Sequence, residues 1–286
     1  MMEGPEAGDW AGIALALRDA GEDRLCSRVP TYLHPLAGRI LAWHVLRALA
    51  TLSPPPRQLL LVTAVPVDPA VVAGLPAGVV PLERKGGWSA ALEERLEPSV
   101  GRLLFVDATA AALSTSLAEL RGGPTGRVLR GAGGEPLAVW LDRSEVAGRV
   151  GNGGGLEALA SGCEETVPGD PGETFAVRDR AALARAGVIV RDRIVRALMD
   201  EGVTFLLPET VLVDVDVTVG PDTVIYPGVV LEGATTIGSE TVIGPGCRII
   251  DSRIGSGVEL KGWNYIVSTA IRNRAVLEPY VRRGHD

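Results

Sequence analysis

The sequence predicts a two-part protein in which an α/β domain with a parallel sheet precedes a short parallel β-helix. Three observations lead to this fold class. Short aliphatic runs first alternate with segments of helical pattern, and a long helical segment follows them. Aliphatic residues then recur at every sixth position. A flat sheet would give a period of two, so the period of six is specific to a β-helix.

Three short aliphatic runs predict buried strands in the first part of the chain. They lie at residues 12–17, 58–63 and 102–107. The segments of helical pattern lie at residues 41–52, 88–96 and 113–120. This alternation predicts a parallel sheet flanked by helices, and ligands of such sheets bind beyond the carboxyl ends of the strands. Asp107 ends one predicted strand and is therefore a candidate site residue.

The stretch from residue 122 to residue 172 is rich in glycine and turn residues, and the sequence places its elements only loosely. The glycine run at residues 151–155 has two interpretations, a phosphate loop that opens a helix or a flexible turn. The turn is favoured, because a bare glycine run is a weak signal. Residues 182–199 then predict a helix that joins the two parts.

The hexapeptide period begins at Leu207. The recurring aliphatic residues are Leu207, Val213, Val219, Ile225, Leu231, Ile237, Ile243 and Ile249. The phase slips by one residue before Ile254 and again before Ile271. Each hexapeptide gives one short strand and a turn, and three of them make a coil, so the segment predicts about four coils.

Composition narrows the class of function. The net charge of −7 disfavours a general binder of nucleic acid or of anionic membranes. The three cysteines are far apart and form no Cys-x-x-Cys pair, which predicts a reduced, cytoplasmic protein. The N-terminal segment lacks the features of a signal peptide, and prolines and an aspartate interrupt the most apolar run, so no membrane span is expected.

Two stretches carry a resemblance to one family. Residues 30–38, PTYLHPLAG, resemble the motif PKVLHPLAG, and residues 202–233 resemble GVT…GPDTVIxPGVVLEG. Both motifs are typical of the bifunctional N-acetylglucosamine-1-phosphate uridyltransferase/glucosamine-1-phosphate acetyltransferase family. The resemblance implies a Rossmann-like nucleotidyltransferase domain at residues 10–182, a linker helix at 183–202 and a left-handed β-helix at 203–286. It also implies a homotrimer.

The phosphate-binding loop of that family is only partly kept. Its LAAGxGTR motif matches residues 17–24, LRDAGEDR, in which Arg24 is retained and Gly21 is the remaining glycine. Ala20 and Glu22 replace the motif glycines, so Cβ atoms block close approach of the backbone to phosphate. The lysine of PKVLHPLAG is Thr31 here. The resemblance implies Arg24 as a catalytic residue and Gly21 as a nucleotide-binding residue.

The family's uracil-binding QxGTAHA motif matches residues 85–91, KGGWSAA. By this resemblance Lys85 and Gly87 are nucleotide-binding candidates. Trp88 replaces the threonine and has two interpretations, stacking on a base or packing in the core, of which the core is favoured.

The metal site implied by the family depends on Asp107. This residue matches the metal-binding aspartate and is thus the candidate Mg²⁺ ligand and a catalytic candidate, while an ordinary aspartate at a strand end is the favoured alternative. The second metal position lies in the family's VNDR motif, which matches residues 177–180, VRDR. Arg178 takes the place of an oxygen ligand, and a guanidinium cannot bind Mg²⁺.

Two hypotheses follow. The first is a divergent sugar-nucleotide pyrophosphorylase relative without catalysis, acting as a binding or assembly subunit linked to nucleotide-sugar metabolism. The alternative is an active uridyltransferase that uses Mg²⁺ to make UDP-N-acetylglucosamine from UTP and N-acetylglucosamine-1-phosphate. The replaced ligands favour the first. The coils that carry the family's acetyltransferase site have no counterpart here, so neither hypothesis includes acetyl transfer.

Overall fold

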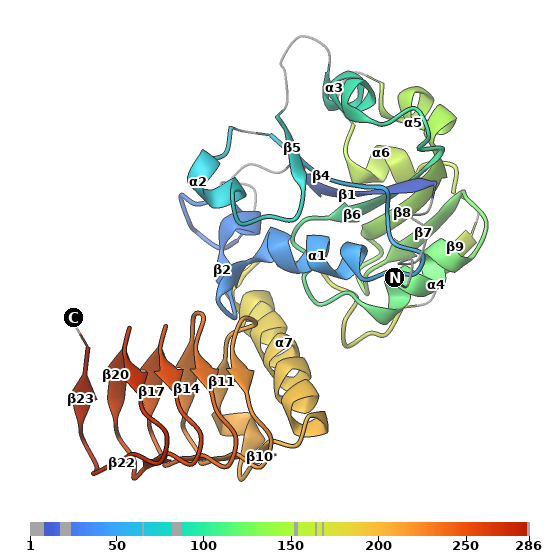
Figure 1. Ribbon diagram of the computed structural model, residues 1–286. Helices are drawn as coiled ribbons and strands as arrows, with labels where there is room; N and C mark the ends of the chain where they lie inside the picture. Colours follow the sequence, from blue (N-terminus) through green and yellow to red (C-terminus); the bar gives the residue numbers. More distant parts are fainter. Residues whose placement is uncertain are drawn as a thin grey trace, which may run out of the picture. The chain divides into compact units, whose positions relative to one another are not determined.

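The structure is a computed structural model that describes residues 9–17, 24–64, 66–81, 87–151, 154–163, 165–167 and 169–284. The chain forms two compact units. The first runs to His34 and resumes over Ile40–Ala186, and the second comprises Pro35–Arg39 and the chain from Gly187 onward (Figure 1). Within the described residues no helix is long and apolar enough to cross a membrane.

A seven-stranded sheet forms the centre of the first unit, in the order β5-β4-β1-β6-β8-β7-β9. Its strands are β1 (Trp10–Ala16), β4 (Gln58–Thr63), β5 (Gly78–Pro81), β6 (Arg102–Asp107), β7 (Arg127–Arg130), β8 (Pro136–Asp142) and β9 (Glu165–Val167). Strands β5, β4, β1 and β6 are parallel, as predicted. Strand β8 runs antiparallel to β6 and β7, which the sequence had not indicated.

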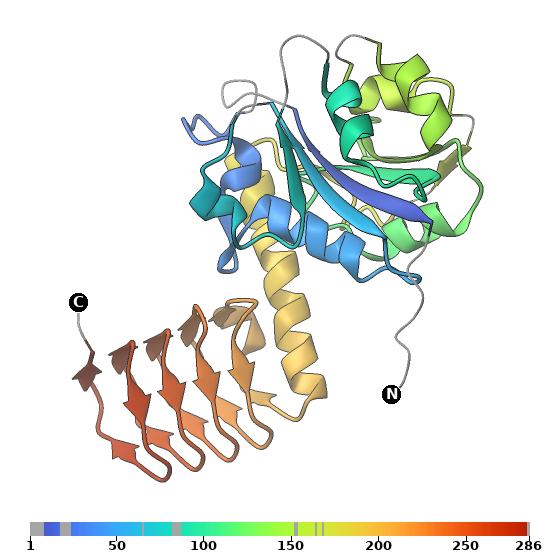
Figure 2. The same cartoon turned by 45° about the horizontal axis from the view of Figure 1, so that its top comes forward.

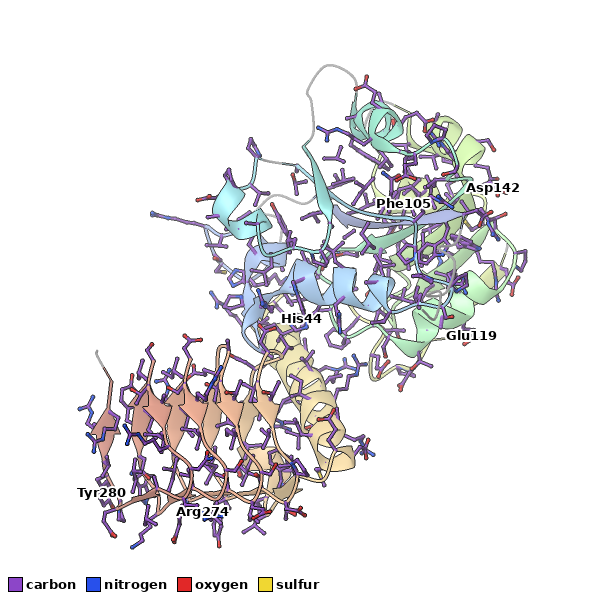
Figure 3. All side chains as sticks on the ribbon, viewed as in Figure 1. His44, Phe105, Glu119, Asp142, Arg274 and Tyr280 are labelled. Atoms are coloured by element: carbon purple, nitrogen blue, oxygen red, sulfur yellow. The ribbon has the colours of Figure 1, made fainter. Side chains whose placement is uncertain are left out.

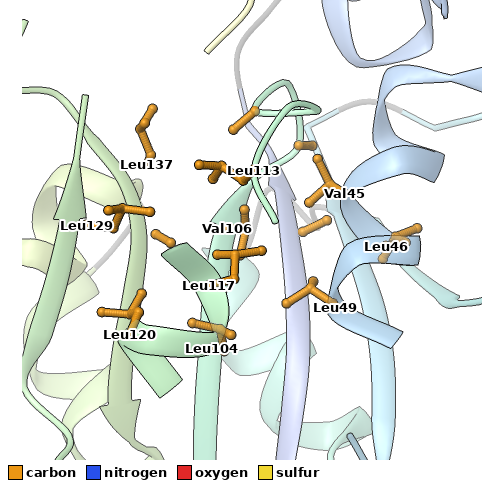
Figure 4. Close-up of a cluster of buried hydrophobic side chains, with 14 of the residues drawn as sticks. Val45, Leu46, Leu49, Leu104, Val106, Leu113, Leu117, Leu120, Leu129 and Leu137 are labelled. Atoms are coloured by element: carbon orange, nitrogen blue, oxygen red, sulfur yellow. The ribbon is translucent and has the colours of Figure 1, made fainter. Parts of the chain in front are cut away.

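Helices cover both faces of this sheet (Figure 1). They are α1 (Leu41–Ala50), α2 (Pro69–Val72), α3 (Gly87–Arg95), α4 (Thr115–Gly122), α5 (Arg143–Val150) and α6 (Leu156–Ala160). Alternate residues of β1 point to opposite faces, because side chains along a strand have a period of two. Ala14 packs with α1 and α4 in one core, shown in Figure 4, and Ile13 packs with α3, α5 and α6 in the other. Phe105 lies in that second core (Figure 3).

The second unit contains a parallel β-helix of three sheets (Figure 2). The sheets are β10-β13-β16-β19-β22, β11-β14-β17-β20-β23 and β12-β15-β18-β21. The strands are short: β10 (Thr204–Phe205), β11 (Leu212–Val213), β12 (Thr218–Val219), β13 (Val224–Ile225), β14 (Val230–Glu232), β15 (Thr236–Ile237), β16 (Val242–Ile243), β17 (Arg248–Ile250), β18 (Arg253–Ile254), β19 (Glu259–Leu260), β20 (Tyr265–Val267), β21 (Ala270–Ile271), β22 (Val276–Leu277) and β23 (Arg282–Arg283). Helix α7 (Arg180–Asp200) leads into this unit.

The predicted aliphatic residues form stacked ladders inside the β-helix. Ile225 pairs with Ile243, and Ile243 pairs with Leu260 in the next coil, and all three are buried. The phase slip before Ile254 arises because one coil is one residue shorter than the coil before it. Ile237 therefore pairs directly with Ile254. The fold therefore confirms the sequence prediction of a Rossmann-like α/β domain followed by a β-helix.

The LHPLAG motif is divided between the two units. His34 ends the first segment of unit one, while β2 (Pro35–Leu36) and the turn that follows cluster with unit two. In that unit the Val215 N–H donates to the Ala37 carbonyl at 3.1 Å. The Arg39 Nε donates to Asp216 Oδ2 at 2.7 Å. These contacts give the turn a structural role within the second unit.

Candidate functional site

The candidate site lies at the carboxyl ends of β1 and β6, the two central parallel strands. Their register sets Leu15 beside Asp107, so the carboxyl ends of both strands meet at one edge. This is the edge at which a parallel α/β sheet binds its ligands. Asp107 is the last residue of β6, and its side chain is 12% exposed.

The carboxylate of Asp107 is held by a charged, fully connected network. The Thr109 backbone N–H and Oγ1 both donate to Asp107 Oδ1, at 2.9 and 2.6 Å. The Arg178 guanidinium forms an ion pair with Asp107 Oδ2 and donates to Thr109 Oγ1 at 2.7 Å. Each oxygen of the carboxylate therefore accepts from a donor in the protein.

This arrangement does not fit a magnesium ion at Asp107. Magnesium requires several oxygen ligands in near-octahedral geometry, whereas a guanidinium offers only N–H donors and a positive charge. Arg178 neutralises the carboxylate through its ion pair with Asp107 Oδ2. Within the described part of the chain, no three His, Cys, Asp or Glu residues are grouped as a metal site.

Arg24 contributes main-chain contacts beside this network. Its N–H donates to the Arg178 carbonyl at 2.7 Å, and Arg24 pairs with Asp179 in an isolated parallel bridge. The Arg180 Nε donates to the Leu25 carbonyl at 3.1 Å. The two segments therefore hold each other in place. Arg24 itself is exposed and does not line the cleft at Asp107.

The predicted nucleotide-binding residues are only partly described by the structure. Gly21 and Lys85 lie outside the described residues. Gly87 is the first residue of α3 and has a φ of 71°, a conformation that favours glycine. Trp88 is 1% exposed, and its Nε1 donates to the Gly154 carbonyl at 2.9 Å. Its ring meets Phe105 edge to face, so Trp88 is a core residue and is not available for stacking on a base.

A cleft of about 290 Å³ opens at Asp107. It is lined by Leu15, Leu17, Asp107, Glu135, Pro136, Gly155, Leu156, Glu157 and Arg178. Three of these lining residues are carboxylates and one is a cation. The described lining is thus net negative, and a bound triphosphate would meet electrostatic repulsion there.

Sequence reasoning missed one residue of the network at Asp107 and several residues that line the cleft. Thr109 was not predicted, although a threonine two residues after a strand-end aspartate can form such a side-chain turn. Glu135 and Glu157 lie in the stretch whose elements the sequence could not place. Gly155, the last residue of the glycine run, lines the cleft just before the short helix α6.

A larger concave region lies elsewhere in the first unit, between α3 and α5. Its volume is about 780 Å³, and Leu92, Leu103 and Val146 contribute to its lining. Arg143 also lines this region. Its guanidinium pairs with Glu93 at 2.6 Å and donates to backbone carbonyls. This region contains no predicted site residue, so the cleft at Asp107 remains the candidate.

Comparison with known proteins agrees with this architecture. The sequence profile of the bacterial transferase hexapeptide family (six repeats) matches residues 216–251. The bifunctional protein GlmU of Acetivibrio thermocellus is 40% identical over 117 residues, which are 40% of this chain and 25% of that protein. The bifunctional protein GlmU of Carboxydothermus hydrogenoformans is 44% identical over 117 residues, 40% of this chain and 26% of that protein. The matches thus span about a quarter of the length of these relatives.

One solved structure is similar in fold. The homologue of Mycobacterium tuberculosis rv0371c from Mycobacterium sp. strain JC1 superposes with a TM-score of 0.50 at 16% identity, covering 65% of this chain and 99% of that chain. The fold and the repeats define a protein with a Rossmann-like α/β domain and a hexapeptide β-helix. Over the matched residues, the chain is similar in sequence to bifunctional GlmU proteins.

Proposed function

We propose that this chain is a sugar-nucleotidyltransferase relative that no longer transfers nucleotides and acts as a binding or assembly subunit linked to nucleotide-sugar metabolism. One observation carries the proposal, the ion pair between Asp107 and Arg178. Nucleotidyl transfer needs a divalent cation to neutralise the charge that develops on phosphate. Here the carboxylate that would hold that cation is neutralised by an arginine of the same chain.

The electrostatics of the cleft support the same conclusion. Glu135 and Glu157 line it, and neither has an opposite charge among the other lining residues once Arg178 is paired with Asp107. A triphosphate held without a metal would face these carboxylates at short range, where Coulomb repulsion is strong. The described lining of the cleft therefore offers neither a cation beyond the paired Arg178 nor a positive surface, which supports the proposed loss of the reaction.

We further propose that the chain assembles as a homotrimer in the cytoplasm. The β-helix exposes large apolar side chains that a neighbouring copy would cover, among them Leu212, Trp263 and Val276, each more than half exposed. The three cysteines are free in the structure, as in a reducing compartment. Light scattering of the purified chain tests the assembly, and a monomer at micromolar concentration would contradict it.

A direct assay tests the loss of chemistry. The purified chain is incubated with UTP, N-acetylglucosamine-1-phosphate and Mg²⁺, and pyrophosphate release is measured beside a complete uridyltransferase as positive control. We expect no release above background. Turnover would overturn the proposal and establish the alternative, an active uridyltransferase that makes UDP-N-acetylglucosamine.

A further inference from the structure

Charge is distributed unevenly along the β-helix. Residues 207–247 contain six acidic residues and no lysine, arginine or histidine, whereas residues 248–284 contain seven lysines and arginines and three acidic residues. The whole chain carries a net charge of −7, so the positive segment departs from the overall composition. A local concentration of charge attracts groups of the opposite sign to its own part of the surface.

Three of these arginines lie on one face of the β-helix. Arg253 lies on β18 and pairs with Ala270 of β21, the next strand of the sheet β12-β15-β18-β21. Arg272 directly follows β21, and Arg274 lies two residues further along the chain, on the outer surface of the coils (Figure 3). All three arginines are exposed. We call Arg253, Arg272 and Arg274 the basic patch.

The basic patch departs from the repeat of the preceding coil. The register of β18 and β21 places Arg272 where that coil has Gly255. The same register places Arg274, with a φ of 58°, where that coil has Gly257, with a φ of 65°. A backbone with such a φ favours glycine and strains a residue that carries a side chain. The fold alone would therefore favour glycine at this turn, so the arginine has another role.

The guanidinium groups of the basic patch are available to a ligand. Over the residues that the structure describes, Arg253, Arg272 and Arg274 form no ion pair and no side-chain hydrogen bond. By contrast, Lys261 in the same part of the β-helix is paired with Glu278 at 2.6 Å. The patch therefore offers both its charge and its N–H donors to a group outside the chain.

The basic patch stays open in the proposed homotrimer. The apolar side chains that a neighbouring copy would cover include Leu212 on β11 and Val276 on β22, and these strands belong to the other two sheets. The described strands of the sheet β12-β15-β18-β21 expose no large apolar side chain. Assembly through apolar surface would therefore leave this face to another partner.

An acidic protein segment fits the basic patch better than a nucleic acid or an anionic membrane does. A guanidinium binds a carboxylate through two parallel hydrogen bonds. A longer polyanion would extend beyond the patch and meet residues 207–247, whose acidic side chains repel it. A short acidic segment meets only the positive part of the surface.

We propose that the basic patch docks an acidic segment of a partner protein. Carboxylates of that segment accept hydrogen bonds from the three guanidinium groups, and salt weakens the complex because the contacts are exposed. This inference rests on the proposed function, since it names the chemistry of the partner that a binding or assembly subunit would hold.

Fluorescence anisotropy of the full chain with a labelled oligoglutamate peptide tests the inference. We expect the peptide to bind, the complex to weaken as salt is added, and an oligolysine peptide not to bind. The double variant Arg272→Gly with Arg274→Gly has the residues of the preceding coil, so it should fold. We expect it to bind the peptide at least about tenfold more weakly. Arg253→Gln leaves the turn unchanged and should weaken binding as well.

The matched control is Arg282→Ala with Arg283→Ala, which removes the same charge from β23. It should bind within about threefold of the parent chain, because salt screens distant charges. The inference is overturned if the peptide does not bind, if the glycine variant keeps full affinity, or if both double variants lose affinity equally. Tighter binding of a single-stranded oligodeoxythymidylate of the same charge would overturn it in favour of a nucleic-acid partner.

A thermal melt confirms that each variant is folded. Pyrophosphate release and light scattering of the same samples test the proposed function separately from peptide binding. Failure of the proposed function and failure of this inference are therefore distinguishable.

Discussion

Arg178 and Asp107, which are 71 positions apart in the sequence, form an ion pair at the carboxyl end of strand β6. The pair lies where the resemblance to uridyltransferases implies a metal ligand. On the proposed function, the Arg178 guanidinium provides the positive charge beside Asp107 in place of a bound metal ion. A cation of this kind cannot exchange, and it presents only donors to its surroundings.

Removing the arginine should leave a half-buried charge without compensation. We expect Arg178→Asn to lower the free energy of unfolding by about 1–3 kcal/mol, less than for a fully buried pair because Arg178 is 29% exposed. The double variant with Asp107→Asn should recover part of the loss. Urea denaturation measures both, with Arg95→Asn on the surface of α3 as the control. A single variant as stable as the parent chain would show that the pair contributes nothing.

Gly38 should be intolerant of a side chain for two separable reasons. Its φ is 81°, and a Cβ there would lie 2.7 Å from the Asp214 Cγ. Gly38→Ala should therefore be destabilised by more than the 1–2 kcal/mol, roughly, that the left-handed backbone alone costs. Gly126 has a φ of 84° and open space around it, so Gly126→Ala reports the backbone effect alone. Equal losses of stability in the two variants would argue against the contact with Asp214.

The half-buried carboxylate of Asp214 should make stability depend on pH. Burial raises the pKa of Asp214, and the nearby carboxylates of Glu232 and Asp216 act in the same direction. A raised folded-state pKa means that the native state binds the proton more tightly, so this contribution favours folding at low pH and is lost as pH rises through the folded pKa. Asp214→Asn should thus melt at a higher temperature than the parent chain at pH 7, and the difference should vanish below the pKa of an unfolded aspartate. A difference that is constant with pH would exclude this cause.

The core position of Trp88 gives a matched pair of substitutions. Trp88→Phe removes buried volume and the hydrogen bond to the Gly154 carbonyl, so we expect a loss of about 1–3 kcal/mol. Val29 of the first unit is 47% exposed, and Val29→Ala should change stability by less than about 0.5 kcal/mol. Chemical denaturation of both variants measures the contrast. Similar stability of the two would indicate that Trp88 is not packed in the core.

The β-helix was predictable because its signal is local. Each hexapeptide carries its own aliphatic residue, and even the shorter coil is visible as the slip before Ile254. The strands at residues 58–63 and 102–107 were predicted at their observed bounds for the same reason. Antiparallel β8 was missed because glycine-rich segments surround it and hide its boundaries.

The candidate site was less predictable because its contacts are long-range. The sequence indicated that Arg178 is incompatible with a metal, but the pairing of its guanidinium with Asp107 depends on the folded chain.

The hairpin at Pro35–Arg39 has a consequence for how the chain is made. Arg39 contacts Asp216, 177 positions later. At a synthesis rate of about 5–20 residues per second, the hairpin leaves the ribosome roughly 10–35 s before its partner exists. During that interval, Arg39 lacks the carboxylate that it contacts in the folded chain. A chain that is cut between the two units would separate Arg39 from Asp216 permanently.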